Sequence, residues 1–111
     1  MFLGGDVMKR AEQLIKDYFN GRLDVNIKCS KLEMDYLKTD DDTKLKAYES
    51  DKRSVDEVLA TLTPIQLQAI TMHDKDNMTW QDISDKLGIK RYVLEDLKSK
   101  VLKELKTRLE A

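Results

Sequence analysis

The sequence predicts an all-α protein, with an N-terminal helical hairpin or helical arm followed by a C-terminal helix-turn-helix bundle. Helix-breaking residues are rare, because the 111 residues include one proline and four glycines. Charged residues make up 37% of the chain and hydrophobic residues 41%, a mixture that supports a modest core. Apolar residues also recur three and four positions apart through most of the chain, which is the spacing of one helix face.

The first helix is expected over residues 7–19, where the apolar residues form one broad face. Asp6 is the expected N-cap of this helix. Asn20 and Gly21 are expected to end it, because both residues tolerate a positive φ.

Residues 22–38 fit more than one structure. The part around Val25 and Ile27 alternates apolar and polar residues like a β-strand, and a shorter helix could begin with a capping box at Ser30. Two apolar stripes at helical spacing favour a single helix that is covered on both sides, by the first helix and by another surface such as a second copy of the chain. The stripes are Leu23, Ile27, Ser30, Met34 and Leu37 on one face, and Val25, Cys29, Leu32 and Tyr36 on the other.

Residues 39–53 contain five acidic and four basic residues with weak periodicity, so a mobile linker is expected there. The chain is thereby divided into three parts. Residues 1–38 form an N-terminal helical region for dimerisation or partner contact, residues 39–53 the charged linker, and residues 54–111 a helix-turn-helix domain.

The expected domain begins with a short amphipathic helix at 54–62. The next helix restarts at Thr63, a natural N-cap, with Pro64 at the first helical position and Gln66 completing a capping box. Thr79 is the expected N-cap of the helix after that.

Gly88 is expected to end that helix in a tight turn, because glycine takes a positive φ at little cost. The last and longest helix then covers 90–109. A helix, a tight turn and a second helix are the outline of a DNA-binding helix-turn-helix, whose second helix enters the major groove. The residues expected to hold the two helices at a fixed angle are Trp80, Ile83, Leu87, Ile89, Leu94 and Leu97.

The last half of the chain resembles region four of the sigma-70 family. The resemblance starts with "LT" at 62–63, a capped helix start, and continues with "DIS" at 82–84 and "LGI" at 87–89. It implies a module that binds promoter DNA. The other matching residues are Trp80, Leu94, Val101, Leu102 and Leu105.

The layout of a helix pair, a charged linker and this module is similar to that of small phage-encoded regulators of the RinA/ArpU type. That resemblance implies a transcriptional regulator of phage or prophage origin, which binds double-stranded DNA and contacts RNA polymerase. Two alternatives stay open. One is a helix-turn-helix protein-interaction module, a polymerase adaptor or inhibitor that does not bind DNA. The other is a small subunit of a phage DNA-packaging machine.

The last helix is the only clearly basic element. Seven basic residues stand against three acidic ones between Lys90 and Arg108, a local excess of four positive charges (7 − 3). In the sigma-like alignment Lys90, Arg91 and Tyr92 open the recognition helix, where side chains reach base edges, and Lys98 lies along the phosphates. The residues expected to bind DNA are Thr79, Lys90, Arg91, Tyr92, Glu95 and Lys98.

Glu95 and Asp96 depart from the family pattern, which prefers basic or amide residues at these positions. A carboxylate can accept a hydrogen bond from cytosine, but it also repels phosphate. Glu95 therefore either reads a base, pairs locally with Arg91 or Ser99, or weakens binding.

Other classes of function are disfavoured. The net charge of −1 confines any nucleic-acid contact to a local patch. Cys29 is the only cysteine, which excludes an internal disulfide and fits the cytoplasm. No nucleophile–base pair, phosphate loop or metal-ligand cluster is present, so an enzyme, a metal site and a cofactor are not expected. No apolar run approaches the ~18 residues that a membrane span needs.

Overall fold

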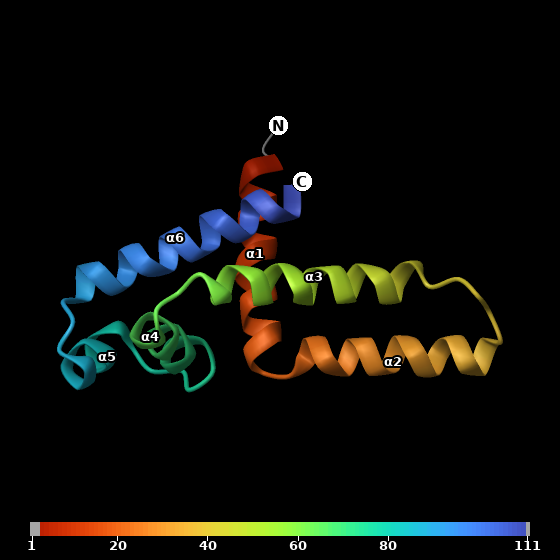
Figure 1. The fold of residues 1–111 in the computed structure, drawn as a ribbon, viewed down its shortest axis with the longest axis horizontal. Coiled ribbons are helices and arrows are strands. Elements are labelled where there is room, and N and C mark those ends of the chain that lie inside the picture. Colours follow the sequence, from red (N-terminus) through yellow and green to blue (C-terminus); the bar gives the residue numbers. More distant parts are fainter. Residues whose placement is uncertain (1–2, 111) are drawn as a thin grey trace.

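The computed structural model describes residues 3–110, with side chains described from Val7 onward, and within that range the chain forms six α-helices and no strand (Figure 1). The predicted all-α class is confirmed. The helices are α1 (Leu3–Phe19), α2 (Arg22–Leu37), α3 (Thr43–Ala60), α4 (Pro64–Asp74), α5 (Trp80–Leu87) and α6 (Arg91–Glu110).

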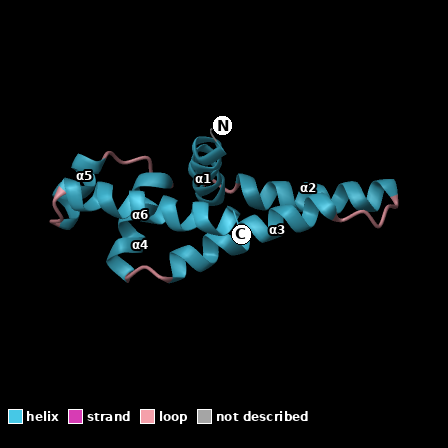
Figure 2. Ribbon diagram, turned by 90° about the horizontal axis from the view of Figure 1, so that it is seen from above, coloured by secondary structure: helices cyan, strands magenta, loops and turns pink. Residues whose placement is uncertain are grey.

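The helices form two parts that meet at α1. Helices α2 and α3 run side by side as a long hairpin, and α4, α5 and α6 gather at the opposite end of the molecule (Figures 1 and 2). Helix α1 contacts α6 as well as α2 and α3. The overall shape is elongated, 53 Å by 32 Å by 21 Å.

One hydrophobic core joins the N-terminal and C-terminal parts of the chain. Ile15 of α1, Val58 of α3 and Leu105 of α6 are fully buried in the same cluster. The expected boundary between an N-terminal region and a separate C-terminal domain therefore does not separate two cores. The buried residues of this cluster are Ala11, Leu14, Ile15, Leu23, Val55, Val58, Leu59, Ile70, Val101, Leu102 and Leu105.

The linker expected at 39–53 is wrong for residues 43–53, which form the first part of α3. The expected short helix at 54–62 is the second part of the same helix, which ends at Ala60. Leu45 and Tyr48 are half-buried and continue the apolar stripe of Val55 toward the N-terminus at helical spacing. The many charged residues between them make this stripe difficult to recognise in the sequence.

Ion pairs to neighbouring helices also hold the charged part of α3. Asp51 accepts a hydrogen bond from Arg10 of α1 at 2.8 Å, and Lys52 donates to Asp24 of α2 at 2.8 Å. A highly charged segment can therefore be ordered when its charges have partners on packed helices.

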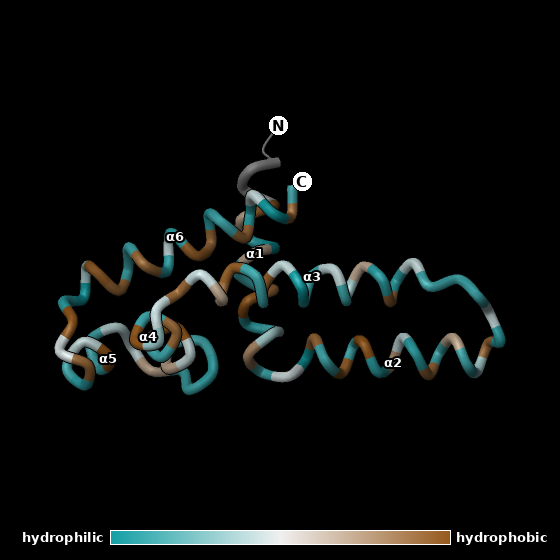
Figure 3. Tube along the Cα trace, in the orientation of Figure 1, coloured by the Kyte–Doolittle hydropathy of each residue, from teal (hydrophilic) through white to brown (hydrophobic). Residues whose placement is uncertain are grey.

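Helix α2 is a single helix, as the two stripes predicted, so the strand and the shorter helix beginning at Ser30 are both excluded. Gly21 takes the expected positive φ of 83° between α1 and α2. The expected N-cap at Asp6 is wrong, because α1 begins earlier, at Leu3. Apolar and polar residues alternate along the whole of α2 in Figure 3.

Candidate nucleic-acid interface

The helix that supports the candidate site starts with the predicted capping box. The Thr63 hydroxyl accepts a hydrogen bond from the Gln66 backbone N–H at 3.3 Å, and the Gln66 side chain accepts one from the Thr63 N–H at 3.0 Å. Pro64 occupies the first helical position. These contacts satisfy backbone donors that the first turn of α4 leaves free, so the start of the helix is fixed.

The two helices of the predicted helix-turn-helix are α5 and α6. Thr79 caps α5 by accepting a hydrogen bond from the Asp82 N–H at 3.1 Å. Gly88 ends α5 with φ of 69°, and its N–H donates to the Ser84 carbonyl at 2.9 Å. The positive φ turns the chain so that α6 begins two residues after Ile89, with Lys90 accepting backbone hydrogen bonds from its first turn.

A second core cluster holds α4, α5 and α6 together. Ile83 of α5 is fully buried, and Leu94 of α6 is 1% exposed, in the same cluster as Ala69 and Met72 of α4. The rings of His73 and Trp80 stack with their centroids 3.8 Å apart, which also joins α4 to α5. The partly buried residues packed on this cluster are Met78, Trp80, Leu87, Ile89 and Leu97.

Four of the predicted site residues lie exposed at the start of α6. These are Lys90, Arg91, Tyr92 and Glu95, and the Tyr92 side chain is 61% exposed. Arg91 Nε donates a hydrogen bond to Glu95 Oε1 at 3.1 Å, which is one of the alternatives left open by the sequence. Thr79 is also exposed, at the start of α5, so it lies on the neighbouring helix of the same unit.

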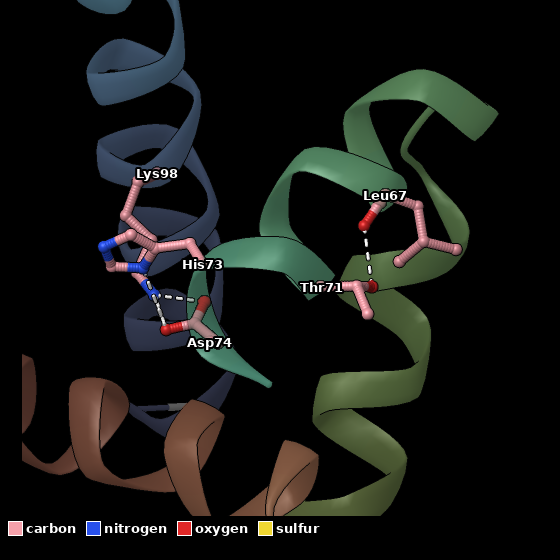
Figure 4. A network of polar contacts seen from close by, with 5 residues as sticks. All are labelled: Leu67, Thr71, His73, Asp74 and Lys98. Atoms are coloured by element: carbon pink, nitrogen blue, oxygen red, sulfur yellow. Dashed lines mark hydrogen bonds and ion pairs between the residues drawn. The ribbon is translucent and has the colours of Figure 1, made fainter. Parts of the chain in front are cut away.

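The structure does not place the Lys98 side chain where it could make the expected phosphate contact. Lys98 Nζ donates to both carboxylate oxygens of Asp74, at 2.6 and 2.5 Å, and His73 Nδ1 lies 3.3 Å from the same carboxylate (Figure 4). The Lys98 side chain is 14% exposed and that of Asp74 is 2% exposed. Lys98 therefore fixes α6 to the end of α4 and does not belong to the exposed face.

Intramolecular pairs reduce the positive charge of α6. Besides Lys98 and Arg91, Lys106 lies 3.7 Å from Glu110 and Arg108 lies 3.0 Å from Glu57. Among the described residues, the basic side chains of this segment without a carboxylate partner are Lys90, Lys100 and Lys103. The excess of four charges counted in the sequence is therefore partly neutralised in the fold.

Two further exposed residues lie on the same side of α6 as Tyr92. Tyr92, Asp96, Ser99 and Lys103 are all exposed and lie four, three and four positions apart, so they share one side of α6. Ser99 and Lys103 were not among the predicted site residues. Their helical spacing from Tyr92 is the signal that could have identified them.

An apolar groove runs between α4 and α6 beside this face. Ala69 of α4 and Val93 and Leu97 of α6 line it, together with Ile89 of the turn. Gln66, Leu94, Asp96 and Lys100 complete the lining. Among the side chains described, those of residues 7–110, no group of three or more metal-ligating side chains is found, and no helix within residues 3–110 is long and apolar enough to cross a membrane.

Comparisons with known proteins give a family but no function. No curated protein and no solved structure matches the chain. The model of a family described as "Protein of unknown function (DUF722)" matches residues 29–109, from the middle of α2 nearly to the end of α6. Since the match covers most of the sequence, the chain belongs to the DUF722 family.

Proposed function

We propose that this protein is a DNA-binding transcriptional regulator that reads double-stranded DNA with the start of α6. The observation that carries the proposal is that the first turns of α6 have one buried side and one exposed side. Leu94 is buried against α4 and α5, whereas Arg91, Tyr92 and Glu95 of the same turns are exposed. A helix held by its neighbours, with polar side chains exposed at its N-terminal end, is what a major-groove reader requires.

The finer parts of the proposal rest on the resemblance to sigma region four and to the RinA/ArpU-type regulators. They are promoter DNA as the target, contact with RNA polymerase, a cytoplasmic location and a phage or prophage origin. Because only Lys90, Lys100 and Lys103 of the last helix lack a carboxylate partner among the described residues, binding by one copy is expected to be modest and to depend on salt.

Fluorescence anisotropy with a labelled random-sequence duplex, repeated over a series of salt concentrations, tests DNA binding. Arg91→Ala is expected to weaken binding, because it removes a positive charge from the start of α6 and leaves the negative charge of Glu95 without its partner. Lys46→Ala is a matched control, because Lys46 is also exposed and also forms an i,i+4 pair, with Asp42, but lies at the far end of the α2–α3 hairpin (Figure 1). If the wild-type chain shows no salt slope, or if both variants bind alike, the assignment of α6 is wrong.

Thr79 gives a second test on α5. Thr79→Asp keeps an N-cap that can accept from the Asp82 N–H, so the helix stays capped. The added carboxylate faces the phosphates in a bound complex, so DNA affinity is expected to fall while thermal stability is retained. Unchanged DNA affinity would remove Thr79 from the interface.

A second candidate function is a protein-interaction module, and the groove between α4 and α6 favours it. Its lining by Ala69, Ile89 and Val93 suits an apolar side chain of a partner such as RNA polymerase. Val93→Glu tests this second hypothesis by pull-down with purified polymerase after nuclease treatment. Retention of polymerase by the wild type and its loss in the variant would favour an adaptor or inhibitor, whereas DNA binding without polymerase retention would count against it.

A further inference from the structure

Helix α2 has an apolar face that no described part of the chain covers. Val25, Cys29, Leu32 and Tyr36 lie four, three and four positions apart, so they form one stripe, called the outer stripe here. Val25 is 55% exposed, Leu32 67% and Tyr36 86%, and Cys29 is exposed as well. This is a row of three large apolar side chains and one cysteine at the spacing of a helix–helix contact.

The opposite face of α2 is already used within the chain. Leu23 and Ser30 are buried, and Ile27 and Met34 are half-buried, on the side that faces the rest of the molecule. Helix α2 lies at the edge of the molecule, with α3 along one side of it only (Figure 1). Packing of the hairpin therefore does not explain why the outer stripe is apolar.

We propose that the outer stripe packs against the outer stripe of a second copy of this chain, with the two α2 helices antiparallel. Residues 25 and 36 are symmetric about the same midpoint as residues 29 and 32. An antiparallel pair centred there places Val25 opposite the partner's Tyr36 and Cys29 opposite the partner's Leu32. Every residue of the stripe then meets an apolar residue.

Charges beside the stripe select this orientation. Lys28 and Asp35 flank one side of it, and neither has an ion-pair partner within the described part of the chain. The antiparallel register places Lys28 beside the partner's Asp35, and the symmetry repeats the pair. A parallel pair would instead place Arg22 opposite the partner's Arg22.

A parallel pair would also direct Lys28 toward the partner's Glu33. Glu33 already lies 3.6 Å from Lys44 within its own chain, so that contact would have to compete with an existing one. The antiparallel contact is short, and an interface of this size associates reversibly. It leaves the start of α6 free on both copies, so the association does not depend on the proposed DNA binding.

Sedimentation equilibrium over a range of protein concentrations tests the proposal. The wild type is expected to dimerise, and Leu32→Glu to weaken the dimer by about tenfold or more, since a charge would be buried at its centre. Ile65→Glu is the matched control, because Ile65 is also an exposed aliphatic residue, at 46%, but lies on α4. A chain that stays monomeric throughout, or a dimer that Leu32→Glu leaves unchanged, would overturn the proposal.

A charge exchange tests the register. Lys28→Glu alone is expected to weaken the dimer, and adding Asp35→Lys to restore it. Failure of the second change to restore affinity would overturn the proposed pair. Both residues are exposed, so circular dichroism of each variant is expected to match the wild type.

Disulfide trapping tests the orientation. In a Cys29→Ser background, Val25→Cys and Tyr36→Cys chains are prepared separately and oxidised alone or mixed. The antiparallel register predicts cross-linking in the mixture only, because each new cysteine lies opposite the other position. Cross-linking of each variant with itself would show a parallel pair and overturn the proposal.

Discussion

The ammonium group of Lys98 contacts both carboxylate oxygens of Asp74, 24 positions earlier in the chain. The pair joins the second turn of α6 to the last residue of α4, and the Asp74 side chain is 2% exposed. The orientation of the proposed reading helix is thus set by a buried ion pair as well as by Leu94 and its apolar neighbours. An interaction of this kind stabilises one arrangement strongly only while both partners are present.

Replacing Lys98 alone is expected to lower the free energy of unfolding more than replacing Lys98 and Asp74 together. Lys98→Met leaves the buried carboxylate of Asp74 with His73 at 3.3 Å as its remaining polar neighbour, and a loss of about 3 kcal/mol in the free energy of unfolding is expected. The double variant Asp74→Asn/Lys98→Met is expected to recover most of this loss, because no charge is left buried. Urea denaturation followed by circular dichroism measures the free energy of unfolding of both variants. Equal losses in the single and the double variant would contradict the explanation.

Glu95→Gln is expected to raise affinity for a random-sequence DNA duplex. The substitution removes a negative charge from the exposed start of α6 and ends the ion pair with Arg91, while the glutamine amide oxygen can still accept the hydrogen bond at 3.1 Å. Stability should change by less than about 0.5 kcal/mol, because the pair is exposed. Asp42→Asn, which ends the ion pair with Lys46 in the same way, is the control for anisotropy titrations. Weaker binding by Glu95→Gln would instead indicate that Glu95 contacts the DNA directly.

Gly88→Ala is expected to destabilise the protein by about 1 kcal/mol through the backbone alone. The φ of Gly88 is 69°, and a Cβ placed there would meet nothing within 4 Å, so no steric clash contributes. Gly88→Asn should cost less, since asparagine adopts this conformation more readily. Thermal or urea unfolding compares the stability of the two variants. Equal losses of stability would mean that backbone strain at a positive φ is not the cause of the destabilisation.

Tyr18 is expected to contribute a pH-dependent part of the stability at alkaline pH. Partial burial, together with the hydrogen bond that its hydroxyl donates to Asp56 and the charge of that carboxylate, raises the pKa of Tyr18 from 10.0 to about 12. Because the folded-state pKa is the higher one, the contribution is complete below pH 10.0 and is lost as the pH rises through about 12.

Tyr18→Phe removes this dependence. The difference in unfolding free energy between the wild type and Tyr18→Phe should be constant below pH 10.0 and shrink above it. Absorbance titration of the phenolate checks the pKa itself.

The local features of this protein could be predicted from short stretches of sequence. The capping box of Thr63 and Gln66, the cap at Thr79 and the turn at Gly88 each depend on residues within three or four positions of one another. Their side-chain and backbone chemistry determines them before any long-range packing. The single helix α2 was also predictable, because two stripes at helical spacing are difficult to reconcile with a strand.

Other features depended on contacts that sequence spacing does not reveal. The charged segment 43–53 is helical because Asp51 and Lys52 find partners on α1 and α2, and these partners lie 41 and 28 positions away. Lys98 could be placed on α6 from its sequence but not on its inner side, because Asp74 is its partner only once α4 and α6 have packed.

The sequence by itself therefore determined the helical class, the caps and turns, and the position of the turn between α5 and α6, since these follow from local backbone and side-chain preferences. The tertiary structure alone decided which charges are neutralised, which stripe of α2 is buried and which remains exposed. The physical reason is that burial and ion pairing depend on the distance between helices, which the spacing of residues along one helix does not specify.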